Sequence, residues 1–455
     1  MTQIRNPYNG EVLADIPDSS EADVRDAIQR AEAIAGTLAT MPAHQRARIL
    51  SKTAQLIEAQ AEDLARLMTQ ESGKPIRYAR GEVGRAVETF TFAADEARRI
   101  HGETVPMDAA RNGVGKIGYY IRVPVGVVAA ITPFNFPLNL VAHKIAPAVA
   151  AGCPVVLKPA PATPLSAIRL QEIMTEAGLP QGAFEIVTGG ADVGHWLTTD
   201  PRVRLITFTG SPPVAHKISQ VAGLRRTLFE LGGNAATVID EDADIDRALD
   251  RTIIGSFAYS GQVCISVQRI YIHRKHYDAF RQRFAERTEA LIMGDPLEDN
   301  TEIGPMINEQ AAQRVESWVQ EAVRDGARLV AGGKRDGVMF RPTVLENVDP
   351  SMQVMCNEVF GPVVNLIPFD DFDEALAQVD DSPFGLQAGV YTRDLAKAMR
   401  AVQRLNVGGV MINDVPTFRV DHMPYGGNKD SGIGREGPRF AIEEMTNIKM
   451  VVINV

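Results

Sequence analysis

Apolar and polar positions in the first hundred residues alternate with the period of an α-helix. Residues 21–35, 43–72 and 82–100 place apolar side chains three and four positions apart, which predicts three helices. The segment Asp18-Ser19-Ser20 precedes the first of them and can accept hydrogen bonds from the free amides at its start. This part of the chain is therefore predicted to be helical.

From Val125 onward, short β-branched runs alternate with helical stretches. The predicted strands are Val127–Thr132, Pro154–Lys158, Phe184–Val187 and Leu205–Thr209, and the predicted helices are 137–151 and Ser166–Ala177. A second α/β series runs from about Asn234 to Asp430, with strands at Arg269–His273, Arg328–Ala331, Phe340–Val344 and Gly409–Asn413. Such alternation is typical of parallel sheets covered by helices, which bind ligands at the carboxyl ends of their strands.

Composition narrows the class of protein. A chain of 455 residues with 45% apolar content is long enough for two or three domains. The formal net charge of −10 argues against a nucleic-acid partner, which a basic face would bind. Apolar runs stay well below the ~20 residues that span a bilayer, and Met1–Glu11 lacks a signal-peptide core. Three scattered cysteines predict neither disulfides nor a metal site, so we expect a cytoplasmic protein without membrane or metal.

Four segments carry residues suited to covalent catalysis on a carbonyl carbon. Cys264 stands in Gly261–Ser266, Glu230 precedes Leu231-Gly232-Gly233, Asn135 lies between two prolines, and Glu358 stands in Asn357–Pro362. A thiolate can attack, an amide can stabilise the oxyanion, and a carboxylate can act as general base. Each segment also has a bland interpretation: a buried cysteine, a turn asparagine or a surface glutamate. Only their combination is strong evidence.

In this order the four segments resemble the NAD(P)-dependent aldehyde dehydrogenase superfamily from near Asn6 to the C-terminus, most closely its lactaldehyde and related small-aldehyde members. The resemblance implies an α/β fold with a Rossmann-like cofactor domain (1–109 and 125–232) and an α/β catalytic domain (233–430). It further implies a small bridging sheet from segments 110–124 and 431–455, which would join subunits of a homodimer or homotetramer. The expected cofactor is NAD or NADP.

The segment Gly113–Gly118 matches the string G-x-G-x-x-G, which in dinucleotide-binding proteins follows a strand and opens a helix. Here it leads into Tyr119–Val123, which alternates like a strand. We therefore interpret it as a hairpin turn of the bridging sheet rather than a phosphate-binding loop.

The resemblance assigns catalytic roles to Cys264, Asn135, Glu230 and Lys144. Cys264 is the expected nucleophile, and a helical turn at Ile265–Gln268 would favour its thiolate. Asn135 and the Cys264 amide would hold the oxyanion, and Lys144 matches a lysine of the proton-relay path. Glu230 would activate the thiol or water, and its presence favours hydrolysis to a free acid over transfer to coenzyme A.

The resemblance also assigns residues to the cofactor site. They are Thr132, Pro133, Phe134, Lys158, Pro161, Gly190, Gly194, Phe208, Gly210, Ser211, Leu231, Gly232, Glu358 and Phe360. Lys158 matches a lysine that binds the adenosine ribose, although a solvated strand cap is an equally good interpretation. Pro161 replaces a glutamate that in NAD-preferring relatives would repel a 2′-phosphate, so the cofactor preference stays open.

The expected substrate pocket contains Leu140, His143, Val263, Ile265, Arg419 and Tyr425. A histidine and an arginine suit a short polar or anionic aldehyde. The alternatives are a half-buried helix position for His143 and a surface or intersubunit ion pair for Arg419, with Asp421 for example.

The sequence thus predicts NAD(P)⁺-dependent oxidation of a small polar or anionic aldehyde, such as lactaldehyde or glycolaldehyde, through a cysteine thiohemiacetal and thioester. One alternative is a phosphonate- or phosphate-bearing aldehyde or a semialdehyde as substrate. An alternative of another class is a ligand-binding or structural homologue without activity.

Overall fold

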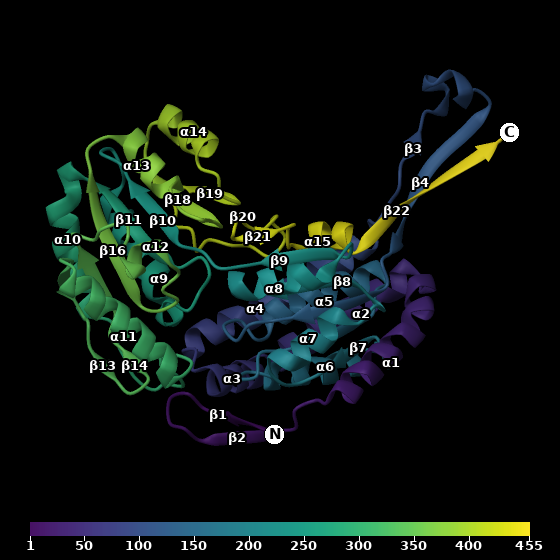
Figure 1. Cartoon of the computed structure of the whole chain (residues 1–455), viewed down its shortest axis with the longest axis horizontal. Coiled ribbons are helices and arrows are strands. Elements are labelled where there is room, and N and C mark those ends of the chain that lie inside the picture. The colour runs from purple at the N-terminus through teal and green to yellow at the C-terminus, as the bar shows by residue number, and fades with distance from the viewer.

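A computed structural model describes all residues 1–455 and shows two α/β bodies, from which a narrow ribbon of strands projects (Figure 1). The chain starts with a hairpin and four helices. They are β1 (Thr2–Arg5), β2 (Val12–Ile16), α1 (Glu21–Thr40), α2 (Ala43–Ala59), α3 (Ala61–Ser72) and α4 (Ile76–Ala97). Ser20 caps α1 in a reciprocal capping box with Asp23, which confirms the predicted helix start.

Two helix predictions in this region were wrong in detail. The stretch 43–72 forms two helices, because the backbone of Gln60 leaves the helical region between α2 and α3. Helix α4 begins at Ile76 rather than near residue 82, directly after Pro75, and ends at Ala97. A proline is well tolerated at a helix start, where its missing N–H has no intrahelical partner.

The first body contains a six-stranded sheet in the order β21-β9-β8-β5-β6-β7. All neighbours are parallel except β21. The strands are β5 (Val127–Ile131), β6 (Val155–Lys158), β7 (Phe184–Ile186), β8 (Val203–Thr209), β9 (Arg226–Glu230) and β21 (Gly432–Ile433), and the helices between them are α5 (Asn139–Ala151), α6 (Leu165–Glu176), α7 (Ala191–Thr199) and α8 (Pro212–Ala222). The strand order reverses at β5, and ligands bind at such a switch point in open α/β sheets.

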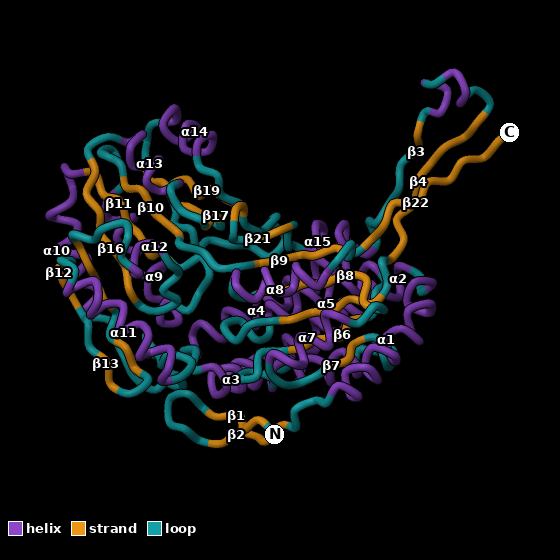
Figure 2. Tube along the Cα trace, in the orientation of Figure 1, coloured by secondary structure: helices purple, strands orange, loops and turns teal.

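The second body contains a seven-stranded sheet in the order β12-β15-β16-β11-β10-β18-β19 (Figure 2). Its strands are β10 (Ala235–Ile239), β11 (Val267–His273), β12 (Arg328–Ala331), β15 (Thr343–Glu346), β16 (Val363–Phe369), β18 (Gln387–Tyr391) and β19 (Gly409–Ile412). The helices are α9 (Ile245–Phe257), α10 (Arg274–Glu289), α11 (Glu309–Arg324), α12 (Gln353–Cys356), α13 (Phe372–Asp380) and α14 (Leu395–Arg404), with the 3₁₀ segment η3 (Ala258–Gly261) after α9.

The predicted strand Phe340–Val344 was wrong as a single element. Its first residue belongs to β14 (Met339–Phe340), which pairs with β13 (Arg335–Asp336), whereas β15 joins the large sheet after Pro342. A proline lacks the backbone donor that a continuous central strand needs. The short strands β17 (Phe384–Gly385) and β20 (Asn428–Lys429) form a further pair.

The projecting ribbon is the sheet β22-β4-β3, formed by β3 (Thr104–Val105), β4 (Lys116–Pro124) and β22 (Thr446–Asn454). The 3₁₀ segments η1 (Met107–Ala109) and η2 (Arg111–Gly113) connect β3 to β4, and α15 (Pro438–Glu444) leads into β22. Gly113–Gly118 thus leads into a strand and opens no helix, as its context predicted. Among the helices, none combines the length and the apolar character that crossing a membrane requires.

Buried carboxylates from the N-terminal helices hold the starts of two sheet helices. Oε1 of Glu82 accepts the backbone amides of Leu138 and Asn139, both at 3.0 Å, where α5 begins. The other oxygen of Glu82 pairs with Lys74, and both side chains are almost fully buried. Glu71 accepts the amides of Leu165 and Ser166 at the start of α6, and burial raises its pKa to about 7.

Replacing Lys74 with methionine is expected to lower the free energy of unfolding by about 3–5 kcal/mol, because it leaves the Glu82 charge buried and unpaired. Arg80→Met is the matched control, since Arg80 pairs with Glu62 and Asp299 at the surface and its loss should cost far less. Urea unfolding of both variants measures the difference. Equal losses would show that the Lys74–Glu82 pair does not hold α5 in place.

Candidate active site

A cavity of about 310 Å³ opens where loops from the two sheets face each other. Its lining comes from the carboxyl ends of β5, β8 and β9 on one side and from the segments before β11 and β16 on the other. The lining residues are Pro133, Phe134, Asn135, Leu140, Thr209, Gly210, Ser211, Glu230, Leu231, Gly232, Cys264, Arg314, Glu358 and Phe360. The sequence predicted all of them as site residues except Thr209 and Arg314.

The backbone before Cys264 is held in a strained conformation. Tyr259 and Ser260 have φ values of 50° and 54°, and Gly261 follows at 68°. The hydroxyls of Tyr259 and Ser260 donate to the carbonyls of Ser72 (2.9 Å) and Gly304 (2.7 Å), which anchor the segment. Left-handed backbone at non-glycine residues is costly and concentrates at functional sites.

The predicted helical turn after Cys264 is absent. The chain makes one turn, with the Ser266 amide bonded to the Val263 carbonyl, and then enters β11 at Val267. No helix start therefore lowers the pKa of the thiol. Burial instead raises the pKa of Cys264 to about 11, opposed by the hydrogen bond from Tyr425 and by the charge of Arg419.

Asn135 is buried after β5 and faces the Cys264 segment. Its side-chain nitrogen donates to the Gln262 carbonyl at 3.0 Å, and its oxygen has no hydrogen-bond partner. An amide nitrogen carries two hydrogens, so one remains for another acceptor. The geometry therefore leaves a fixed donor in the cavity lining.

Glu230 ends β9 with its carboxylate buried and both oxygens without a hydrogen-bond partner. A Cβ added to Gly426 would lie 2.8 Å from Oε1 of Glu230, so this glycine makes room for the carboxylate. Burial first, and then the negative charge of Glu436, raise the pKa of Glu230 well above its ordinary value. The surface-glutamate interpretation was therefore wrong.

Glu358 and Phe360 line the opposite wall. The Gly233 amide donates to Oε1 of Glu358 at 3.1 Å, and burial raises the pKa of Glu358 to about 7. A Cβ on Gly232 would overlap Oε2 of this carboxylate. The ring of Phe360 meets Phe134 edge-on, with centroids 5.7 Å apart.

The residues predicted for the distal cofactor site lie at the ends of β5, β6 and β8, beyond the cavity. Lys158 is buried, so the solvated-cap interpretation was wrong. Its Nζ donates to the carbonyls of Pro159 (3.1 Å) and Gly189 (3.2 Å), and burial lowers its pKa to about 8. A Cβ on Gly194 would touch Lys158 at 3.6 Å. The Thr132 amide bonds the Lys158 carbonyl at 3.2 Å.

Three further predicted cofactor residues shape this region through their backbone or by packing. Gly190 occupies the N-cap of α7, and Pro161 lines a small hollow of about 10 Å³ beside Gly189. Phe208 packs edge-on against Phe229 beneath Gly210, with centroids 6.1 Å apart.

The glycines and the buried lysine at this end of the sheet fit a dinucleotide. At the start of α8, Pro212 and Pro213 have no N–H, and the Val214 amide bonds the Ser211 carbonyl at 3.1 Å, so the amide of Ser211 itself is the one left for an anion. Gly232 leaves room beside Glu358 that any larger side chain would fill. Lys158 offers a cation with no acidic partner.

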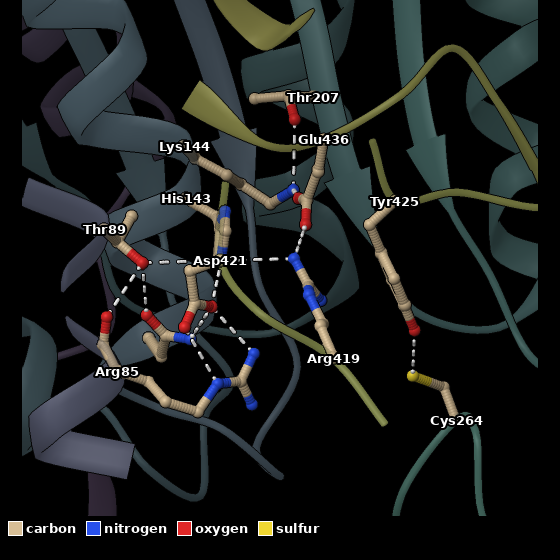
Figure 3. A network of polar contacts seen from close by, with 11 residues as sticks. Arg85, Thr89, His143, Lys144, Thr207, Cys264, Arg419, Asp421, Tyr425 and Glu436 are labelled. Carbon is tan, nitrogen blue, oxygen red and sulfur yellow. Dashed lines mark hydrogen bonds and ion pairs between the residues drawn. The ribbon is translucent and has the colours of Figure 1, made fainter. Parts of the chain in front are cut away.

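A buried polar network lies beside the cavity (Figure 3). Lys144 pairs with Glu436 at 3.0 Å and donates to Thr207 at 3.0 Å. The other oxygen of Glu436 pairs with Arg419 at 3.2 Å. Although burial opposes ionisation, the charges of Lys144, His143 and Arg419 hold the pKa of Glu436 down at about 2.

The second half of the network corrects the alternatives for two predicted residues. His143 is fully buried and lies 2.8 Å from Asp421 and 3.1 Å from Arg419. Asp421 pairs with Arg85 at 2.8 Å, not with Arg419. Arg419 is therefore no surface ion pair; its guanidinium lies 3.6 Å over the ring of Tyr425.

Tyr425 connects the network to Cys264, the predicted nucleophile, with Oη 3.1 Å from Sγ. Val263 and Ile265 pack with Tyr425 and Leu386 into a small apolar cluster around Cys264. His143, Lys144, Arg419 and Tyr425 do not themselves line the cavity.

The sequence profile of the aldehyde dehydrogenase family matches residues 1–451. The chain is 48% identical to the 3-sulfolactaldehyde dehydrogenase of Priestia megaterium, over 100% of this chain and 95% of that protein. It is 40% identical to the lactaldehyde dehydrogenase of Methanococcus aeolicus, over 99% and 97% of the two chains. The chain belongs to the aldehyde dehydrogenase family.

Solved structures of this family have the same fold as this aldehyde dehydrogenase. Aldehyde dehydrogenase 21 from Physcomitrella patens, with its reaction product succinate, superposes with a TM-score of 0.98 at 44% identity, over 100% of this chain and 95% of that one. Glyceraldehyde-3-phosphate dehydrogenase from Methanocaldococcus jannaschii, with NADP, gives 0.96 at 39% identity, over 100% and 99%. The protein is an NAD(P)-dependent oxidoreductase.

Besides Thr209, sequence reasoning did not assign Glu436, Arg314 or Arg85 to the dehydrogenase site. Glu436 follows the glycine-rich stretch Gly432–Arg435, and a lone carboxylate beside glycines was a usable signal. Arg314, on α11, and Arg85, on α4, stand among other charged residues of amphipathic helices. Nothing in the local pattern separates them from solvated positions.

Replacing Gly232 with alanine is expected to raise KM for the cofactor at least about tenfold, because the new Cβ would push Glu358 out of its place. Steady-state kinetics and cofactor titration measure the change. Gly36→Ala is the control, since Gly36 lies on α1 outside the cavity lining and a Cβ there meets no atom within 4 Å. An unchanged KM for the cofactor in Gly232→Ala would show that the position of Glu358 does not matter for cofactor binding.

Proposed function

We propose that this dehydrogenase oxidises a small polar or anionic aldehyde to its carboxylate through a covalent thioester. The observation that carries the proposal is the single cavity lined by Cys264, Asn135, Glu230 and Glu358. A nucleophile, an oxyanion donor and a general base in one lining are the parts that acyl chemistry needs.

In this mechanism Sγ of Cys264 attacks the aldehyde carbon and forms a thiohemiacetal. The free hydrogen of the Asn135 amide and the Cys264 backbone amide stabilise the oxyanion. A bound NAD(P)⁺, held by the residues proposed below, would supply the acceptor for the hydride that leaves the carbon. Glu230 then takes a proton from the water that cleaves the thioester, and its unpartnered oxygens leave it free to do so. Lys144 holds Glu436 in place near Glu230.

For the cofactor, we propose that Glu358 binds the nicotinamide ribose and Phe360 packs near the nicotinamide. Arg314, which lies in the lining and donates to the Val359 carbonyl at 2.7 Å, would support this segment. The Ser211 amide would face the pyrophosphate beside Gly210, whose own amide bonds the Glu230 carbonyl at 3.0 Å, and Lys158 would face the adenosine ribose. Because Pro161 brings no carboxylate to that end, we expect both NAD⁺ and NADP⁺ to be accepted.

Charge in the buried network favours an anionic substrate. Three cations, Arg85, Lys144 and Arg419, form ion pairs with only two carboxylates, Asp421 and Glu436, and the pKa of the third nearby acid, Glu230, is raised by burial and by the charge of Glu436. Arg419 lies over the ring of Tyr425, and its positive charge is close enough to Cys264 to lower the pKa of the thiol. Similar proteins are named for 3-sulfolactaldehyde and sulfoacetaldehyde, and one solved relative holds succinate. A sulfonate or carboxylate aldehyde fits this pattern, and a phosphate- or phosphonate-bearing one shares the same anionic chemistry.

The test is reduction of NAD⁺ and NADP⁺, measured separately, across short aldehydes. The panel pairs neutral lactaldehyde and glycolaldehyde with 3-sulfolactaldehyde, succinic semialdehyde, glyceraldehyde 3-phosphate and phosphonoacetaldehyde. We expect higher kcat/KM for the anionic members, and Arg419→Lys should narrow that preference. If neutral and anionic aldehydes were oxidised with equal kcat/KM, the proposal of an anionic substrate would be wrong. If no aldehyde were oxidised, the alternative of a binding protein without activity would be favoured.

We further propose that the projecting ribbon joins subunits of a homodimer or homotetramer. On β22, Ile448, Met450 and Val452 share one strand face and are 61%, 44% and 48% exposed. An exposed apolar edge strand tends to pair with another chain. Ile448→Lys should therefore lower the mass found by sedimentation, and an unchanged mass would contradict the proposal.

The three free cysteines agree with a reducing compartment, and we propose that the protein is located in the cytoplasm.

A further inference from the structure

The Cys264 thiol has one side-chain hydrogen-bond partner, the phenol of Tyr425 at 3.1 Å. Tyr425 is 3% exposed, and its hydroxyl makes no other hydrogen bond. Figure 3 shows the phenol oxygen of Tyr425 pointing at the sulfur of Cys264. Because buried polar groups are normally hydrogen-bonded and this hydroxyl bonds only the Cys264 sulfur, we expect Tyr425 to do more than pack against its neighbours.

Glu436 fixes Tyr425 from two directions. The backbones of the two residues exchange hydrogen bonds at 3.1 and 2.6 Å, which sets the position of the ring. The Glu436 side chain holds Arg419 at 3.2 Å, and this guanidinium lies 3.6 Å from the ring centroid. The backbone of Tyr425 is thus held by Glu436, and the face of its ring is held by Arg419.

We propose that Tyr425 is a catalytic residue whose phenol donates a hydrogen bond to the Cys264 thiolate, and that Arg419 stacked on its ring holds the phenol in this donating position. The inference deepens the proposed function, on which it rests, because it concerns how the same nucleophile is generated. In this proposal Tyr425 acts on the Cys264 thiolate and does not bind the aldehyde.

The proton inventory of this step is simple. The S–H bond of Cys264 breaks, its proton leaves to water or to the Glu230 carboxylate, and the phenol keeps its own proton throughout. Against a neutral thiol either atom can donate, but a thiolate can only accept, so ionisation makes the phenol the donor. Burial first, and then the neighbouring Cys264, raise the pKa of Tyr425 well above its ordinary value, which keeps the donor protonated.

Other groups around the sulfur oppose one another. Glu358 and Glu230 carry negative charge toward it, whereas Arg419 brings positive charge. Burial already makes the thiol a weak acid, and the hydrogen bond from Tyr425 opposes this effect more than the charge of Arg419 does. A hydrogen bond to a charged acceptor is stronger than a neutral one, and its loss corresponds to a change of about ten- to a hundredfold in thiolate population.

The experiment is alkylation of Tyr425→Phe by iodoacetamide across pH, without aldehyde or cofactor, with the Cys264 peptide quantified by mass spectrometry. We expect alkylation about ten- to a hundredfold slower than wild type at neutral pH, and a rate profile displaced to higher pH. KM for the aldehyde should stay within about twofold. If Tyr425 merely packs or contacts substrate, the alkylation profile stays in place, which overturns the proposal.

Tyr391→Phe is the matched control, because this phenol is also buried, has no hydrogen-bond partner and lies outside the cavity lining. Its alkylation profile should equal that of wild type. Cys264→Ser gives the background from Cys153 and Cys356. Thiolate absorbance in the ultraviolet, titrated against pH, repeats the test without a reagent; a profile shared by Tyr425→Phe and wild type there also overturns the proposal. Neither measurement needs an aldehyde, so failure of the substrate panel does not alter their meaning.

Discussion

Cys264→Ala is expected to lose on the order of 10⁴-fold or more in kcat while it still binds NAD(P)H. Without sulfur no thiohemiacetal forms, and an aldehyde carbon held by Asn135 alone releases hydride poorly. The side chain removed is small and only partly buried, so the fold should persist. Reduction of NAD(P)⁺ measures the chemistry, and quenching or enhancement of nicotinamide fluorescence measures binding.

Cys356→Ala is the control for this loss. Cys356 is also a free, partly buried thiol, but it lies at the end of α12 and outside the cavity lining. It should keep wild-type turnover. If Cys264→Ala retained substantial turnover, the covalent mechanism would be excluded, whichever aldehyde is the substrate.

Glu230→Gln is expected to lower steady-state turnover by about 10²–10⁴-fold. The glutamine matches the shape of the carboxylate but cannot accept a proton from water. Attack by Cys264 and the hydride step do not require that water. A single burst of reduced cofactor should therefore remain, about one per active site, followed by a much slower steady state. Rapid mixing separates the two phases.

The pH dependence follows from the direction of the pKa shift. Burial and the charge of Glu436 raise the pKa of Glu230, so the carboxyl is protonated, and inactive as a base, up to a higher pH than usual. Wild-type steady-state turnover should rise as pH passes upward through that pKa. Glu230→Gln should lack this limb in the slow phase while its burst still follows the thiol. A pH limb of the slow phase identical in both enzymes would assign water activation to another group.

Much of the architecture can be predicted from local patterns. The alternation of strands and helices after Val125 predicts the parallel sheet, because each short apolar run fits one buried strand. Ser20 marks the start of α1 through a contact only three residues away. Cys264, Asn135, Glu230 and Glu358 were also found from their segments, and the fold brings all four to one cavity.

Other features depend on contacts between distant parts of the chain. The segment after Cys264 enters β11 because Val267 pairs with Ala235, and this overrides the predicted helical turn. Arg419 pairs with Glu436 and not with Asp421, two positions away, because Asp421 bonds His143 and Arg85. Tyr425 meets Cys264 across 161 positions of sequence.

Residue types and periods of a few positions were enough to identify the family and the α/β class, and to predict Cys264 as the nucleophile. Only the tertiary structure decided which ionisable groups face each other, and hence how acidic each one is. Burial and charges brought together from α5, the segment before β16 and the C-terminal part of the chain shift the pKa values of Cys264, Glu230 and Glu436. No local pattern encodes those distances, because folding creates them.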